Sequence, residues 1–92
     1  MSRASSQPEL LEFPCHFEFK AFGPGDDDEI FLAKVLNAIS SVVPVSRQAM
    51  KSRPSSVGKY QCVSALVTLQ NRRQLEAIYT ALRNIDDLKY LL

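Results

Sequence analysis

The order in which two hydrophobic periodicities follow one another constrains the fold of this chain most. Residues 16–22 alternate between two sets of side chains, Phe17, Phe19 and Ala21 against His16, Glu18 and Lys20. Residues 59–69 alternate in the same way, and their inward set is Val63, Ala65, Val67 and Leu69. A period of two predicts a strand with one buried face, so we expect two half-buried strands, the second of them central.

Two other segments have the spacing of amphipathic helices. The first has an apolar face of Leu32, Val35, Leu36, Ile39 and Val43. It follows Gly23-Pro24-Gly25 and the acidic run 26–29, which suits a helix N-terminus, and Pro44 forbids its continuation. The second begins at Asn71, a capping residue with Gln74 three positions on, and its apolar face is Leu75, Ile78, Tyr79 and Leu82. We expect helices over 28–42 and from residue 72 to Asn84 or Asp86.

Two weaker segments complete the pattern. Residues 45–53 carry basic side chains at Arg47, Lys51 and Arg53, as expected of an exposed edge strand that is protected from aggregation. Residues 88–92 form a short final strand. The order β-α-β-β-α-β predicts an α+β, ferredoxin-like two-layer sandwich, in which two helices cover one face of a four-stranded antiparallel sheet.

The domain organisation follows from length and composition. Ninety-two residues suit one domain, with a flexible Ser-rich tail at 1–9 and a single domain at 10–92. Leu10, Leu11, Phe13 and Pro14 form an apolar lead-in that we expect to dock on the core. No apolar run is long enough to span a bilayer, and two cysteines are too few for a disulfide framework, so we expect a cytoplasmic protein.

The uncovered sheet face is the first candidate binding surface. By parity it carries Glu18, Lys20, Tyr60, Cys62, Ser64 and Leu66. The turn at 54–60 adds hydroxyls and a glycine backbone that could hold an anion, although a plain hairpin turn would explain the same residues. The candidate ligand or partner contacts are therefore Lys20, Ser55, Ser56, Gly58, Lys59, Tyr60 and Ser64.

Catalytic and metal sites find little support. Cys15 and His16 are neighbours that point apart in a strand, and Cys62 has the parity to face His16, but ordinary packing explains all three better. One His and two distant Cys do not make a zinc site, and Asp26, Asp27 and Asp28 lack the spacing of a calcium loop. We expect no catalytic residue, no metal, no cofactor and no enzyme.

RNA binding is a further alternative, since RNA-recognition domains share this chain order. When Tyr60 is aligned with the first stacking aromatic, Cys62 and Ala65 fall where other aromatics are needed. Basic side chains, namely Arg47, Lys51, Arg53 and Lys59, could contact phosphates, but a solvated edge explains them better. With a formal net charge of +1, the chain as a whole offers no attraction to nucleic acid.

Several motifs together resemble one family. They are Leu10-Leu11-Glu12-Phe13-Pro14, then Phe17, Lys20 and Gly23, then Pro54-Ser55-Ser56 with Gly58, Tyr60, Val63 and Ser64. On these residues the chain resembles the YbeD-like proteins, small and largely uncharacterised bacterial proteins that are sometimes labelled lipoate regulators. The resemblance implies a ferredoxin-like fold similar to ACT domains, which bind amino acids and regulate metabolic enzymes. The acidic run after Gly25 departs from that analogy, because it would repel a ligand carboxylate.

Two functional hypotheses follow. The first is a cytoplasmic regulatory or adaptor domain that binds a small ligand or a partner protein through the open sheet face and the 54–60 hairpin. The alternative is a pure protein-protein interaction module without a ligand, and an RNA-binding domain ranks below both. A homodimer that pairs along an edge strand is compatible with the first hypothesis.

Overall fold

The computed structural model describes residues 11–25, 28–54 and 59–92. The elements in chain order are β1 (Cys15–Pro24), α1 (Asp28–Ser40), the 3₁₀ turn η2 (Arg47–Ala49), β2 (Met50–Pro54), β3 (Tyr60–Leu69), α2 (Arg72–Arg83) and β4 (Tyr90–Leu91). The expected tail at 1–9 lies outside the described residues, so its flexibility stays a prediction.

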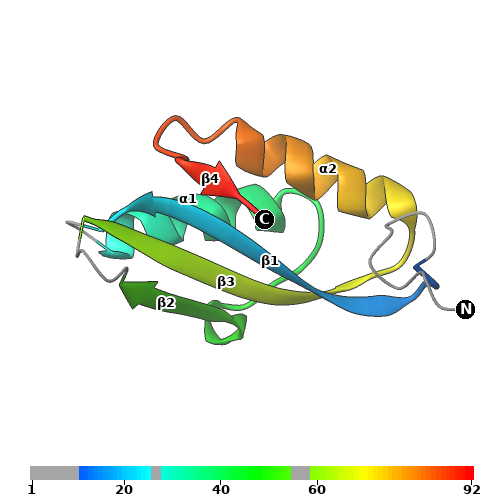
Figure 1. Cartoon of the computed structure of the whole chain (residues 1–92). Coiled ribbons are helices and arrows are strands. Elements are labelled where there is room, and N and C mark those ends of the chain that lie inside the picture. The colour runs from blue at the N-terminus through cyan, green and yellow to red at the C-terminus, as the bar shows by residue number, and fades with distance from the viewer. Residues whose placement is uncertain (1–10, 26–27, 55–58) are drawn as a thin grey trace, which may run out of the picture.

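The four strands form one antiparallel sheet in the order β2-β3-β1-β4. Strands β1 and β3 are the long central pair, and their register runs from Cys15 opposite Leu69 to Pro24 opposite Tyr60. Figure 1 shows α1 and α2 together on one side of this sheet, with β2 at its outer edge. The predicted ferredoxin-like α+β arrangement is confirmed.

The core lies between the sheet and the helices. Most of the inward residues predicted for both central strands are buried, as is most of the predicted face of each helix: Phe19, Ala21, Val63, Ala65, Val67, Leu69, Leu32, Val35, Ile39, Val43, Leu75, Ile78 and Leu82. Phe17, the remaining inward residue predicted for β1, is half-buried. Leu36 and Tyr79 are half-buried at its margin. The expected docking of the lead-in is confirmed for Leu11 and Phe13, which pack against the same cluster. Burial of this apolar surface is the main stabilising term of the fold.

Phe31 is a core residue that the helical spacing did not reveal. It is 1% exposed, and its ring lies directly against Gly23 of β1. A Cβ atom at residue 23 would fall 2.3 Å from that ring, a distance that no packed side chain tolerates. Gly23 is therefore required for the close approach of α1 to β1.

Helix α2 starts as the sequence predicts. The Asn71 side chain accepts a hydrogen bond from the Gln74 backbone N–H at 2.9 Å. Gln74 Oε1 in turn accepts from the backbone N–H of Gln70 at 2.7 Å, one residue earlier than in a standard capping box. Both interactions hold the turn between β3 and α2.

Two of the predicted strands are shorter in the structure. The edge strand starts at Met50 instead of residue 45, because Ala49 N–H bonds to the Ser46 carbonyl and closes a 3₁₀ turn that contains Arg47. Arg47 therefore lies outside the strand and faces Glu29 at 3.6 Å. The last strand, β4, has two residues instead of five, although Lys89 and Leu92 extend its ladder by single backbone bonds to β1.

Candidate functional site

The uncovered face of the sheet presents two neighbouring rows of side chains, the first of which crosses all four strands. One row, read from β2 to β4, is Arg53, Cys62, Phe22 and Tyr90. The next row is Lys51, Ser64 and Lys20, followed by Leu92, whose N–H bonds to the Lys20 carbonyl at 2.9 Å. Because alternate residues share a face, this register places basic groups on the β2 side and aromatic groups on the β4 side.

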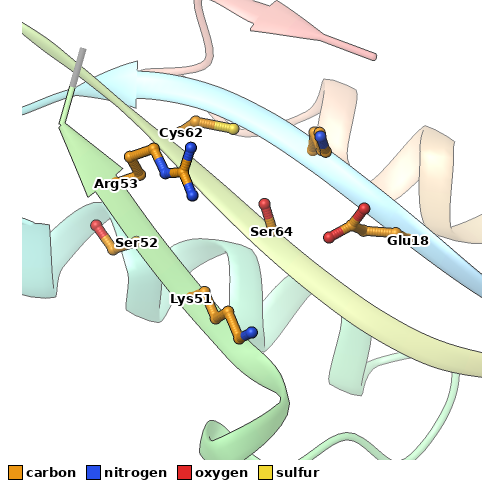
Figure 2. A pocket seen from close by; sticks show the side chains of 7 residues that line it. Glu18, Lys51, Ser52, Arg53, Cys62 and Ser64 are labelled. Carbon is orange, nitrogen blue, oxygen red and sulfur yellow. The ribbon is translucent and has the colours of Figure 1, made fainter. Parts of the chain in front are cut away.

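A hollow of about 540 Å³ occupies the basic half of this face. It is lined by residues of three strands, namely Glu18, Lys20, Lys51, Ser52, Arg53, Cys62 and Ser64. Figure 2 shows the Arg53 side chain extending toward β3 beside Cys62, and Glu18 directed toward the Ser64 hydroxyl. Three cationic side chains and one carboxylate thus line this hollow, which we call the basic hollow.

A smaller hollow of about 240 Å³ continues from the basic hollow toward the start of β2. The two share Glu18, Lys51 and Ser64, and the smaller one reaches Leu66, a large apolar side chain that is 56% exposed. The anion-attracting part of the face therefore ends at Glu18 and gives way to an apolar spot.

A buried amide fixes the strands that carry the hollow. Gln61 is 2% exposed and points to the helix side of the sheet. Its Nε2 donates to the Pro24 carbonyl at 2.8 Å, and its Oε1 accepts from the Ser52 hydroxyl at 2.5 Å. One side chain thus connects β1, β2 and β3, and both polar ends of the buried amide are satisfied.

A second contact holds the turn at the end of β1 against β3. The Gly25 N–H donates to the Lys59 carbonyl at 2.9 Å. A Cβ atom at Gly25 would lie 2.9 Å from the Tyr60 carbonyl oxygen, so a larger residue would separate the two segments. The strand break predicted at Gly23 is wrong, since β1 continues to Pro24, and Gly25 serves to seat the beginning of β3.

The aromatic half of the face consists of Phe22 and Tyr90. Their ring centroids are 5.9 Å apart, with an angle of 54° between the ring planes. Tyr90 is 60% exposed, whereas Phe22 is half-buried. A cross-strand aromatic pair stabilises a sheet edge, and here it also leaves aromatic surface beside the basic hollow.

Some of the predicted site residues line the basic hollow, and others do not. Lys20 and Ser64 are register partners and both line the basic hollow. Tyr60 is exposed further along the same face of β3, and Lys59, also exposed, precedes it outside the hollow lining. The remaining predicted contacts, Ser55, Ser56 and Gly58, lie outside the described residues.

Sequence reasoning left four important residues out of the site. The sequence predicts a solvated edge for Lys51 and Arg53, whereas the structure places both in the lining of the basic hollow. Phe22 and Tyr90 were assigned to strands but not to a face. The parity of β1 would have placed Phe22 beside Lys20, whereas Tyr90 required the register of β4, which the sequence does not reveal.

The arrangement of Cys62 opposite His16 that parity allowed is wrong. His16 lies opposite Thr68, with Nδ1 and Oγ1 3.0 Å apart, while Cys62 lies opposite Phe22. The two positions are six residues apart along β1, which is about 20 Å in an extended strand. The two side chains are too far apart for proton transfer between them.

Clustered metal ligands and membrane-spanning helices are both lacking from residues 11–25, 28–54 and 59–92. Among those residues, His, Cys, Asp and Glu side chains form no group of three or more that could hold a metal ion. None of the helices they form is both long and apolar enough to cross a membrane.

Comparison with known proteins gives relatives in sequence and a match in structure. The chain is 36% identical to the UPF0250 protein of Shewanella sediminis and 32% identical to that of Idiomarina loihiensis, in each case over 91% of this chain and 92% of the relative. The fold is also similar to the solution structure of protein HP0495 from H. pylori, with a TM-score of 0.66 at 15% identity. The match covers 100% of this chain and 94% of HP0495, which supports the fold.

A family match covers nearly the whole chain. Residues 8–92 match the family described as a protein of unknown function, DUF493. The UPF0250 relatives agree with this match, as does the YbeD-like resemblance of the sequence motifs. The chain is therefore a member of the DUF493/UPF0250 family of small bacterial proteins, the YbeD-like proteins.

Proposed function

We propose that this domain is a binding module of regulatory or adaptor type, and that its open sheet face holds an anionic group of a ligand or partner. The observation that carries the proposal is the basic hollow, where Lys20 of β1 faces Lys51 and Arg53 of β2 across β3. A phosphate or carboxylate in this hollow would accept charge-assisted hydrogen bonds from several donors at once.

The charge distribution supports an anionic occupant. The chain has a net charge of only +1, so the attraction is local to this face. Within the described part of the chain, the ion pairs at 4.0 Å or less join Lys34 to Asp87 and Arg47 to Glu29, and neither involves a cation of the basic hollow. An anion there would offset the mutual repulsion of the three cations, one on β1 and two on β2.

We propose that the module binds its ligand without transforming it, in keeping with the separation of Cys62 from His16. A cytoplasmic location is part of the same proposal, since Cys15 and Cys62 are both free thiols, as a reducing compartment favours. The amino-acid ligand and the lipoate role that the family resemblance implies remain predictions. The pairing of two copies of the chain along an edge strand is also still a prediction.

Amide NMR of the ¹⁵N-labelled chain with inorganic phosphate and with citrate, at constant ionic strength, tests the proposal. We expect saturable shifts at Lys20, at Lys51 to Arg53 and at Cys62 to Ser64. The substitution Lys51→Glu should abolish them, because it replaces a cation of the hollow by a carboxylate. Arg73→Glu is the matched control, since Arg73 is exposed on α2. Shifts that are spread over the whole chain, or equal in both variants, would refute the proposal.

The apolar spot supports a second candidate, a protein-protein interaction module that requires no small ligand. Leu66 is 56% exposed, and β2 is an edge strand of the sheet. An extended segment of another protein could pair with this edge and cover Leu66. Failure of both anions in the titration, together with partner capture that is lost on Leu66→Ser, would favour this candidate.

A further inference from the structure

We propose that the anionic ligand is a nucleotide, with its base against Phe22 and Tyr90 and its phosphate in the basic hollow. This inference rests on the proposed function, which it makes specific to one chemical class. The supporting feature is the register, which joins an aromatic pair and three cations on two adjacent rows of one face. A nucleotide presents the same two groups, a flat ring and a phosphate, on one small molecule.

The spacing of the two halves suits such a ligand. Phe22 and Lys20 are two residues apart on one face of β1, which is about 7 Å along a strand. Cys62 is a small side chain that lies between Phe22 and Arg53 in the same row, so it leaves the space between rings and guanidinium open. The distance between the aromatic pair and the cations is therefore of the order of the ribose that joins base and phosphate in a nucleotide.

The exposure of Tyr90 supports stacking. A tyrosine that served only the sheet edge would gain most by covering its ring, yet this side chain is 60% exposed. Phe22 lies at a centroid distance of 5.9 Å and supports the ring from β1. An aromatic ring fixed on a strand can stack against any of the nucleic-acid bases, because every base has a π-face.

Glu18 gives the ligand a direction. It lies two residues from Lys20 on the side away from Phe22, and it lines the basic hollow. Its carboxylate repels a phosphate on that side, so the favourable phosphate position is among Lys20, Lys51 and Arg53. The Ser64 hydroxyl lies between Lys51 and Lys20 in the register and can donate a hydrogen bond to a phosphate oxygen there.

Amide NMR titrations with AMP, adenosine and inorganic phosphate, at equal ionic strength, test this inference. We expect AMP to bind more tightly than either adenosine or phosphate, and to shift Phe22 and Tyr90 together with Lys20 and Arg53. Tyr90→Leu should weaken AMP binding about fivefold or more while leaving phosphate binding unchanged, since stacking contributes this much at the lower end of its range. Leu66→Ala is the control on the same face, and should leave AMP binding as it is.

Two results would overturn the inference while the proposed function survives. These are AMP binding no tighter than phosphate binding, and AMP binding that is insensitive to both Tyr90→Leu and Phe22→Leu. Failure of both inorganic phosphate and citrate to bind would instead remove the proposed function. A fourth probe, a short oligoadenylate, identifies the source of the nucleotide. Tighter binding than AMP would indicate a single strand, and equal or weaker binding a free nucleotide.

Discussion

The two faces of the central strands differ in almost every property although their residues alternate in sequence. On the helix side, β1 and β3 contribute buried apolar residues and a single buried polar one, Gln61. On the open side the same strands contribute Lys20, Phe22 and Ser64, next to cations from β2. Successive residues of these strands therefore alternate between positions that determine folding and positions that are available for binding.

Because the two faces differ in this way, folding stability and ligand binding should respond separately to mutation. Substitutions on the helix side remove buried contacts and should reduce the free energy of unfolding. Substitutions on the open side change groups that are solvated in the free protein, and should leave stability close to its original value. The experiments below probe this separation, beginning with the largest expected effect.

The largest effect is expected from Phe19, which is 1% exposed and packs against Phe17 and Tyr79. Phe19→Ala should lower the free energy of unfolding by about 3–5 kcal/mol, since it leaves a cavity in the core. Glu18→Ala, one residue away on the open face, should change it by less than about 0.5 kcal/mol. Urea unfolding of the two variants measures both values, and similar losses would mean that the faces are not separate.

A smaller effect is expected at Gln61, the buried amide that joins three strands. Gln61→Leu should cost about 1–3 kcal/mol, because the Pro24 carbonyl and the Ser52 hydroxyl lose their partner. Gln70→Leu, at an exposed position just after β3, is the control. Thermal unfolding followed by circular dichroism provides the comparison, and a Gln61→Leu protein as stable as the control would show that the network contributes nothing.

Tyr79 makes the stability of the helix side depend on pH. Its ring packs against Phe17 and Phe19, and burial raises the pKa of the Tyr79 phenol above its usual 10.0, with Arg83 nearby acting in the opposite direction. A raised pKa in the folded state gives stability that is complete below pH 10.0 and is lost as pH rises through the folded-state pKa.

Urea unfolding at neutral and strongly alkaline pH measures this effect. The loss of stability on the alkaline side should be smaller in Tyr79→Phe, which has no phenol to ionise, than in the original chain. Tyr90→Phe, at an exposed position on the open face, is the control. An identical alkaline loss in the original chain and in Tyr79→Phe would contradict the assignment.

The smallest effect on stability is expected in the basic hollow. Lys51→Ser should leave the free energy of unfolding unchanged within about 0.5 kcal/mol, because the side chain is exposed on an edge strand. Removal of one cation also relieves repulsion from Arg53 and Lys20. Chemical unfolding at low and high salt checks this, and a loss of more than 1 kcal/mol would indicate a structural role for Lys51.

The fold was accessible from the sequence because its signals are local. Alternation in β1 and β3, helical spacing in α1 and α2, and the Asn71 cap each depend on neighbours within a few residues. The exceptions were set by tertiary contacts. Phe31 is buried because Gly23 lets α1 approach β1, and the first half of the expected edge strand becomes the turn η2.

The candidate site was only partly accessible. Parity alone placed Lys20, Cys62 and Ser64 on the open face, and all three line the basic hollow. The contribution of Lys51 and Arg53 depends on the register of β2 against β3, and that of Tyr90 on the register of β4 against β1. Register comes from long-range pairing, so no local pattern could reveal which side chains become neighbours.

The most direct test of the account is the amide spectrum of the triple variant Lys20→Ser, Lys51→Ser and Arg53→Ser, recorded with and without inorganic phosphate. All three cations lie on the open face, so the account expects a dispersed, folded spectrum that phosphate no longer shifts at β1, β2 and β3. A collapsed spectrum would show that the open face is needed for folding. Phosphate shifts that persist at these strands would show that the basic hollow is not the binding site.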